Sequence, residues 1–146
     1  MAANPNLPEL SGGQLVVASL RAHGVEMAFS VAGESYLEVL DALYDAPEIR
    51  LVTCRQEGGA AFMAEAYGKL TGKPGVLLVT RGPGACNASI GVHTAHQDST
   101  PVILFIGQVS NEVVERGTVL SWPGALIKRH EQGYCRENCK QKSQAP

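Results

Sequence analysis

Apolar residues in the first two thirds of this chain gather into four short continuous runs, each followed by a glycine or a polar turn. The runs have the length of strands rather than of helices. Their lack of alternation is typical of strands that are buried on both faces of a sheet. They predict strands at Met27–Val31, Ile49–Cys54, Val76–Val79 and Pro101–Ile106.

Small and apolar residues recur at helical spacing between these runs. The first predicted helix has Ser11 at its N-cap and ends at Gly24. The other predicted helices are Ser35–Tyr44, Glu57–Thr71 and Asn87–His96. In the second helix the face expected to be buried is formed by Tyr36, Leu40, Leu43 and Tyr44. In the third helix it is formed by Ala60, Ala64, Tyr67 and Thr71, with Met63 and Leu70 near it.

Buried strands that alternate with helices predict an α/β fold, a doubly wound and mostly parallel sheet with helices on both faces. In such a sheet, ligands bind beyond the carboxyl ends of the strands. The distinctive residues fall at these ends, at Ala32-Gly33-Glu34, Arg55-Gln56-Glu57, Thr80 to Asn87 and Gly107-Gln108. One edge of the sheet is therefore the candidate site.

Composition changes where the periodic pattern stops, after Val109. The chain has 146 residues, of which 45% are hydrophobic and 18% charged, as is typical of one globular domain. Residues 127–146 carry five lysines and arginines against two acids, although the formal net charge of the chain is -2. We expect a flexible leader over residues 1–10, a folded domain over residues 11–109 and a disordered basic tail over residues 110–146.

Several partners and locations are disfavoured. The net charge of -2 gives no reason to expect nucleic acid or an anionic membrane as a partner. No apolar run approaches the roughly 20 residues that cross a bilayer. Residues 1–10 lack the basic start and apolar centre of a signal peptide. We therefore expect a cytoplasmic protein with neither a nucleic-acid partner nor a membrane partner.

The cysteines and histidines do not predict a metal site. Cys135 and Cys139 lack the usual C-x-x-C spacing, and a second pair of cysteines is missing. His93 and His96 are spaced for one helix face and are interpreted as a satisfied or partly exposed pair. The four cysteines also do not have the pattern of a disulfide framework.

Glu57 is the candidate catalytic residue. It stands where a predicted strand gives way to a helix, and Gly58-Gly59-Ala60-Ala61 follow it, so a flat ring can come close to its carboxylate. Thiamine diphosphate needs such a carboxyl, hydrogen-bonded to its aminopyrimidine ring, before its own amine can take the thiazolium proton. Apolar surroundings raise the proton affinity of a carboxyl, as this role requires. The alternative is a carboxylate that only stabilises a helix N-terminus.

A dinucleotide-binding Rossmann-like domain is a second hypothesis. Gly33 follows the first predicted strand, and the acid Glu57 stands 24 residues later, near the spacing at which an acid holds a ribose hydroxyl. The first turn is not G-x-G-x-x-G, however, and Glu34 would place a negative charge beside the pyrophosphate. The pattern therefore disfavours this hypothesis.

Three segments carry a resemblance to a known family: RQEGGAAFMAEAYGKLTGKPGV, TRGPGACNASIGVHTAHQDSTPV and FIGQV, in this order. Together they resemble the N-terminal pyrimidine-binding domain of thiamine-diphosphate-dependent enzymes, in particular the group of acetolactate synthase and benzoylformate decarboxylase. The earlier segment FSVAGESYLEVLDAL is similar to the family's first strand, loop and second helix, with Ala32 where proline is usual. The likeness extends from about Ser11 to Val109.

The resemblance implies roles for individual residues. Glu57 matches the glutamate that activates the aminopyrimidine. The matching cofactor-binding positions are Ala32, Gly33, Glu34, Gly82, Pro83, Gly84, Asn87 and, more weakly, Gln97. The implied cofactor is thiamine diphosphate, and the implied reaction is decarboxylation of a 2-oxo acid or carboligation of the product, a lyase or transferase activity. The family's site forms between two subunits, so the resemblance also implies a homodimer or a partner diphosphate-binding domain.

One expected motif is missing. In the family a C-terminal domain carries G-D-G followed by an asparagine, which hold magnesium and the diphosphate, and no G-D-G occurs in this sequence. We therefore expect a truncated pyrimidine-binding domain, incomplete relative to the family domain, that binds the cofactor weakly and turns over nothing by itself. Two functions follow: a pyrimidine-side half-site, or a catalytically inactive truncated isoform that acts only as a binding or dimerising fragment.

Overall fold

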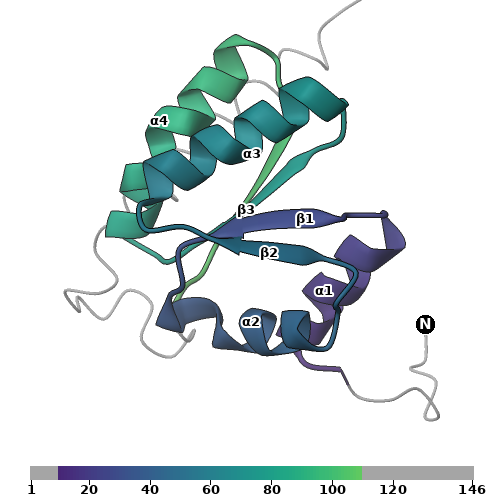
Figure 1. The fold of residues 1–146 in the computed structure, drawn as a ribbon. Helices are drawn as coiled ribbons and strands as arrows, with labels where there is room; N and C mark the ends of the chain where they lie inside the picture. Colours follow the sequence, from purple (N-terminus) through teal and green to yellow (C-terminus); the bar gives the residue numbers. More distant parts are fainter. Residues whose placement is uncertain (1–9, 110–146) are drawn as a thin grey trace, which may run out of the picture.

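The computed structural model describes residues 10–109, which form one α/β domain (Figure 1). Most of the expected leader and all of the expected basic tail, with Cys135 and Cys139, lie outside the described residues. Helices and strands follow one another in the order α1 (Gly12–Ala22), β1 (Met27–Ser30), the 3-10 turn η1 (Glu34–Tyr36), α2 (Leu37–Tyr44), β2 (Arg50–Thr53), α3 (Glu57–Thr71), β3 (Gly75–Val79), α4 (Pro83–Gln97) and β4 (Val102–Ile106).

The four strands form a parallel sheet in the order β2-β1-β3-β4. One row of register partners crosses it from Leu51 through Ala28 and Val76 to Ile103. The chain moves outward from β1 to β2, then returns past β1 to β3 and β4. β1 and β3 are therefore the neighbouring strands at which the direction of winding reverses. The expected doubly wound sheet is confirmed.

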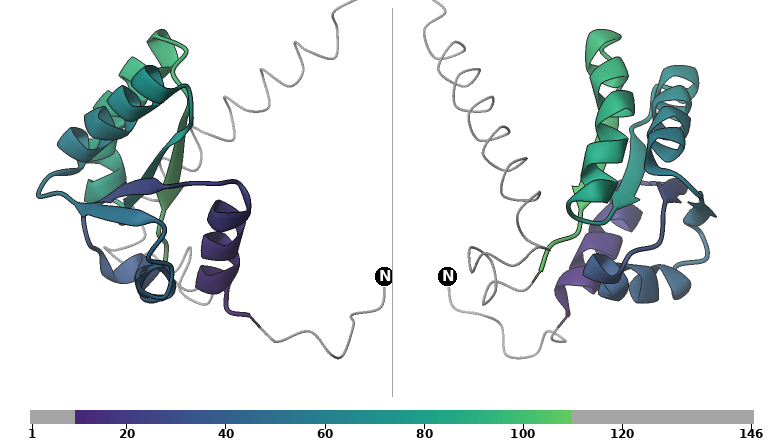
Figure 2. Two further views of the ribbon diagram at one scale, coloured as in Figure 1. Left: turned by 45° about the vertical axis from the view of Figure 1, so that its right-hand side comes forward. Right: turned by 90° about the vertical axis from the view of Figure 1, so that its left-hand side faces the viewer.

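Helices cover both faces of the sheet, α1 and α2 on one and α3 and α4 on the other (Figures 1 and 2). β3 lies in the middle, and all five of its residues are buried. Its side chains alternate, with Val76 and Leu78 in the core under α1 and α2, and Leu77 and Val79 in the core under α3 and α4. A continuous apolar strand is needed here because both of its faces are covered.

Local sequence explains where the helices begin and end. Ser11 and Gln14 form a reciprocal capping box at the start of α1, as expected from the serine at this position. Gly72 ends α3 in the left-handed conformation, with φ of 70°. The predicted boundaries of α3, Glu57 and Thr71, are both correct.

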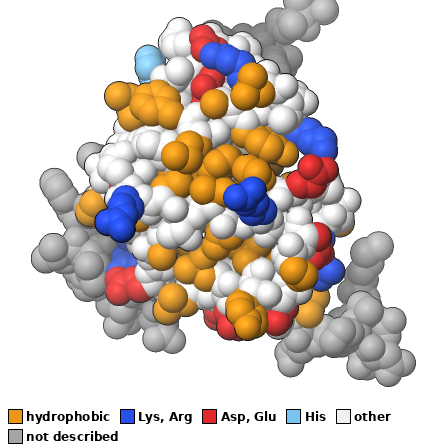
Figure 3. Space-filling model, viewed as in Figure 1, with side chains coloured by type: hydrophobic (Ala, Val, Ile, Leu, Met, Phe, Trp, Pro, Cys, Tyr) orange, Lys and Arg blue, Asp and Glu red, His pale blue; other side chains and the backbone are white. Residues whose placement is uncertain are grey.

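Several sequence predictions are wrong in detail. Tyr44 was expected on a buried face but is 88% exposed, and Leu70 and Met63, expected near such a face, are 86% and 48% exposed. These side chains lie on α2 and α3, where they face away from the sheet. Hydrophobic side chains also lie on the molecular surface in the view of Figure 3. Helical spacing alone did not identify the side that faces the sheet.

The second predicted strand is not a buried one. β2 is an edge strand of the described sheet, with two exposed and two half-buried residues.

The last predicted helix begins at Pro83 rather than at Asn87, because proline is accepted in the first turn of a helix. The predicted helix Ser35–Tyr44 is divided into the turn η1 and the helix α2.

None of the helices within residues 10–109 is long and apolar enough to cross a membrane. The cytoplasmic location stays a prediction.

α3 and α4 pack closely along their length. At the crossing, a Cβ added to Gly91 would lie 2.8 Å from the Ala61 carbonyl carbon. Near their carboxyl ends, Lys69 of α3 binds Asp98, which follows α4, with 2.6 Å between Nζ and Oδ2. Hydrogen bonds to Asp98 and then to Glu65 raise the pKa of Lys69. Small residues thus allow the two helices to approach closely, and the contact between Lys69 and Asp98 joins them near their carboxyl ends.

The substitution Gly91→Ala should destabilise the domain. The added methyl group would collide with the backbone of α3, and overpacking of this kind costs about 1–3 kcal/mol. Gly12→Ala is the matched control, since nothing lies within 4 Å of its added Cβ. There the helix propensity of alanine should stabilise by at most about 1 kcal/mol. Urea unfolding of both variants checks this expectation, and an unchanged midpoint for Gly91→Ala would contradict it.

Candidate functional site

The carboxyl ends of β1, β2 and β3 bring three loops to one edge of the sheet. The loop after β1 carries Ala32, Gly33 and Glu34, the turn after β2 leads into Glu57, and the loop after β3 leads into Pro83. In a doubly wound sheet this edge, near the point where the winding reverses, is the usual place for a ligand.

Glu57 is the first residue of α3 and is half-buried. The preceding residue, Gln56, caps the helix by accepting a hydrogen bond from the Gly59 amide at 2.7 Å. Because Gln56 caps the helix, Glu57 is available for a contact with the neighbouring helix. Asn87 of α4 donates its Nδ2 hydrogen to Oε2 of Glu57 at 3.0 Å. The structure therefore joins Glu57 and Asn87, two of the residues singled out in the sequence.

The first turn of α4 lies near the other carboxylate oxygen. A Cβ at Gly84 would lie 2.9 Å from Cγ2 of Thr80 and 3.4 Å from Oε1 of Glu57. Gly82, just before the helix, has φ of 63°, a conformation that favours glycine. The amino ends of α3 and α4 thus meet at Glu57, where their partial positive charges favour the carboxylate. Among residues 10–109, only Asn87 hydrogen-bonds the Glu57 side chain.

Tyr36 is a buried residue of the segment after β1 that feels the charge of Glu57. Its hydroxyl donates to the Val31 carbonyl and lies 2.9 Å from the Ser30 hydroxyl and 3.3 Å from the Leu78 carbonyl. Burial raises the pKa of Tyr36 above 10.0, the Ser30 hydrogen bond lowers it, and the negative charge of Glu57 raises it. The buried phenol therefore stays neutral near Glu57. Sequence reasoning assigned Tyr36 only to a buried helix face.

Two contacts join the loops after β1 and β3. The Ser35 and Thr80 hydroxyls lie 2.8 Å apart, and Arg81 Nη2 lies 2.7 Å from Glu34 Oε1. Both contacts cross between the ends of β1 and β3, where the winding reverses. In a dinucleotide-binding fold the pyrophosphate lies at this place. This arrangement, with the carboxylate of Glu34 at that point, argues against the dinucleotide hypothesis.

The remaining residues predicted from the sequence lie at different distances from Glu57. Ala32 and Gly33 lie in the loop after β1, and Gly82, Pro83 and Gly84 lie at the start of α4. Gln97 ends α4, roughly 15 Å from Asn87 along the helix axis at the usual rise per residue. Within this chain the structure does not bring Gln97 to Glu57, and its role stays a prediction. His93 and His96 are exposed on α4.

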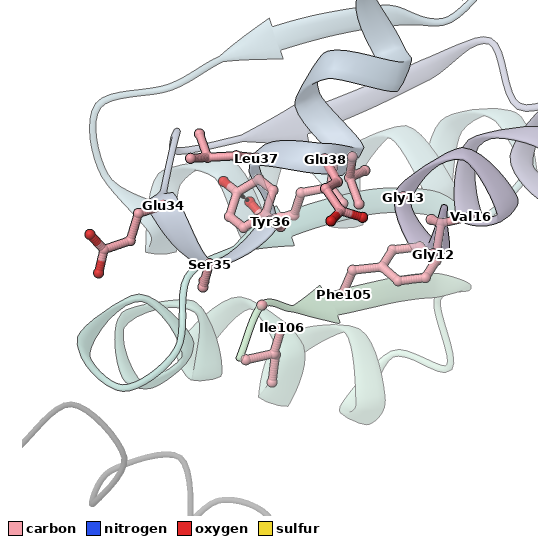
Figure 4. A pocket seen from close by; sticks show the side chains of 13 residues that line it. Gly12, Gly13, Val16, Glu34, Ser35, Tyr36, Leu37, Glu38, Phe105 and Ile106 are labelled. Atoms are coloured by element: carbon pink, nitrogen blue, oxygen red, sulfur yellow. Dashed lines mark hydrogen bonds between the residues drawn. The ribbon is translucent and has the colours of Figure 1, made fainter. Parts of the chain in front are cut away.

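An open groove of about 570 Å³ lies beside the cluster, on the face of the sheet covered by α1 and α2. Its lining includes Gly12, Val16, Tyr36, Phe105 and Gly107. Figure 4 shows Phe105 near Val16, while the Glu34 side chain points away from both. No residue of α3 or α4 lines this groove, so it is separate from the Glu57–Asn87 contact.

Comparison with known proteins gives one family. The family model described as "Thiamine pyrophosphate enzyme, N-terminal TPP binding domain" matches residues 10–135. The match continues past Val109, where the likeness was expected to end, and the boundary at that residue stays a prediction.

Individual relatives are named as acetolactate synthases. The chain is 42% identical over 108 residues to the acetolactate synthase large subunit of Haemophilus influenzae, covering 74% of this chain and 19% of that protein. It is 48% identical over 99 residues to the acetolactate synthase of Bacillus subtilis, covering 67% of this chain and 17% of that protein. The chain thus matches about a fifth of the length of these curated relatives.

The buried hydroxyl of Tyr36 should contribute to stability in a pH-dependent way. Tyr36→Phe leaves Ser30 without its side-chain partner and should cost about 1–3 kcal/mol at neutral pH. Because the folded-state pKa of Tyr36 is raised, its contribution is complete below pH 10.0 and is lost as the pH rises toward the folded-state pKa. The wild-type advantage over Tyr36→Phe should therefore shrink above that pH.

Urea unfolding at a series of pH values measures this difference. Tyr44→Phe is the matched control, because Tyr44 is exposed and the chemical change is the same. Its unfolding free energy should follow that of the wild type at every pH. A constant difference between wild type and Tyr36→Phe across the alkaline range would contradict the expected coupling.

Proposed function

The chain belongs to the thiamine pyrophosphate enzyme family through the N-terminal TPP binding domain, and we propose on this basis that the cluster around Glu57 binds the aminopyrimidine of thiamine diphosphate. The observation that carries the proposal is the contact between Glu57 and Asn87. It orients the carboxylate between two helix starts, with Oε2 held and Oε1 facing the backbone of Gly84.

The residues present fit a flat aromatic ring. A side chain at Gly84 would occupy the space beside Oε1 of Glu57. Gly58 and Gly59 follow Glu57 directly and add no side chains. The ring would be held by Glu57 and by the loop and helix start at Gly82, Pro83, Gly84 and Asn87. Ala32, Gly33 and Glu34 would contribute the loop on the other side.

Glu57 has the main chemical role in this proposal. Thiamine diphosphate, when bound, supplies a carbon nucleophile that attacks the carbonyl of a 2-oxo acid. Oε1 of Glu57 exchanges a proton with a ring nitrogen, and Asn87 keeps the carboxylate oriented by donating to Oε2. A carboxyl positioned within hydrogen-bonding reach of the group it serves can act as an acid and as a base.

The complete reaction is proposed from the relatives. By similarity to acetolactate synthases, this half-site would serve decarboxylation or carboligation of a 2-oxo acid. The diphosphate and magnesium would be held by a separate diphosphate-binding domain, in a homodimer or a partner subunit. The residues described here would supply the pyrimidine side only. We therefore propose that the chain alone binds the cofactor weakly and does not turn over substrate.

An inactive fragment that only binds or dimerises is the second candidate function. These 146 residues contain no G-D-G, the motif that holds the metal and the diphosphate in the family by resemblance. The two candidate functions can be separated by mixing this chain with the diphosphate-binding domain of an acetolactate synthase and measuring turnover. Measurable carboligation of pyruvate in that mixture favours the half-site, whereas dimerisation without turnover favours the fragment.

Calorimetric titration with thiamine diphosphate tests the half-site directly. Wild type should give saturable binding, and Glu57→Gln should weaken it at least about tenfold because the amide does not exchange the proton. Glu38→Gln is the control, since Glu38 also lies in the first turn of a helix, α2, and loses the same charge. NAD should not bind to either protein. Equal affinity of wild type and Glu57→Gln would reject the role of Glu57, and NAD binding would favour the dinucleotide hypothesis.

A further inference from the structure

Arg81 is a buried charge that sequence reasoning left without a role. It lies in the loop between β3 and α4, and only 8% of its side chain is exposed. Its Nη2 donates to Oε1 of Glu34, whereas its Nε is buried and has no partner in the described part of the chain. Glu34 is 71% exposed, so the acid reaches inward to the guanidinium from the surface.

This ion pair joins the two loops on either side of the reversal in winding. Glu34 belongs to the loop after β1, and Arg81 belongs to the loop that starts α4. The hydroxyls of Ser35 and Thr80 make a second contact between the same loops. Thr80 in turn lies beside Gly84, where an added Cβ would be 2.9 Å from Cγ2 of Thr80 and 3.4 Å from Oε1 of Glu57.

We propose that Arg81 and Glu34 form a positioning pair that fixes the loop 31–35 against the start of α4 and thereby sets the width of the pyrimidine site. The proposal rests on the proposed cofactor site. It also changes the interpretation of Glu34, which was expected to contact the cofactor. Glu34 instead serves as the counter-ion of Arg81, and its effect on the cofactor passes through the position of the loop.

Two observations support a positioning role over a general contribution to stability. The Glu34 side chain is 71% exposed and points away from Phe105 (Figure 4), and its ion pair with Arg81 ties it to the other loop. The guanidinium is buried, and a buried charge requires a partner that cannot move away without cost. The position of the loop is therefore coupled to the charge of Arg81.

Three variants separate the positioning role of the pair from its contribution to stability. They are Glu34→Gln, Arg81→Met and the double variant with both changes. Glu34→Gln leaves the buried guanidinium without a carboxylate and should lower the thermal midpoint by more than about 4 °C. The double variant should largely regain the midpoint, because it has no unpaired buried charge. All three should bind thiamine diphosphate about tenfold more weakly than wild type, because none retains the link between the loops.

Amide hydrogen exchange of the ligand-free chain provides a readout that does not depend on the cofactor. In all three variants the amides of residues 32–36 should exchange at least about tenfold faster than in wild type. The control is Glu26→Gln, which removes the carboxylate from the exposed pair of Lys73 and Glu26, also 2.7 Å apart. It should change neither the exchange of this loop nor the affinity.

The outcomes distinguish this proposal from the proposed function. If the double variant regains both midpoint and affinity, the pair is merely structural and the proposal is rejected. Unchanged exchange at residues 32–36 also rejects it. If wild type does not bind thiamine diphosphate, the proposed function fails, and the exchange measurement still decides whether the pair anchors the loop.

Discussion

α3 and α4 approach each other closely at Gly91 and Ala61, and this approach decides where Glu57 lies. Both helices begin at the carboxyl edge of the sheet, so a short distance between them brings their amino ends together. Asn87 can then reach Glu57 with a side chain of only two carbons. A larger residue at the crossing would separate the helix starts and leave the carboxylate without its partner.

The site combines a rigid apolar base with a small number of polar links. The base is β3, whose five residues are buried and whose two neighbours in the sheet are β1 and β4. The links join loops that lie far apart in the sequence: Glu57 to Asn87, Ser35 to Thr80, and Glu34 to Arg81. Each link is short, and together they define the positions of three loops around one carboxylate.

Glu57 illustrates why a residue type alone does not establish a function. A glutamate in the first turn of a helix is common because the helix dipole favours it. Here the cap is provided by Gln56, and the carboxylate contacts a second helix. That contact distinguishes Glu57 from Glu38, which also lies in the first turn of its helix, α2. The geometry therefore separates Glu57 from a glutamate that only stabilises a helix start.

Sequence alone determined the α/β class, the four strands and the limits of α3, and it singled out Glu57 and Asn87, which the structure joins by a hydrogen bond. These features follow from local patterns: continuous apolar runs, small residues at helical spacing, and glycines or caps at the ends of elements. Tertiary structure decided which face of each helix is buried, so Tyr44, Met63 and Leu70 could not be placed correctly. It also decided that Ile49–Cys54 contributes an edge strand, and that Tyr36 and Arg81 belong to the neighbourhood of the site. The physical reason is that burial and ion pairing depend on partners distant in the sequence, such as Glu34 and Arg81, which only the order of strands brings together.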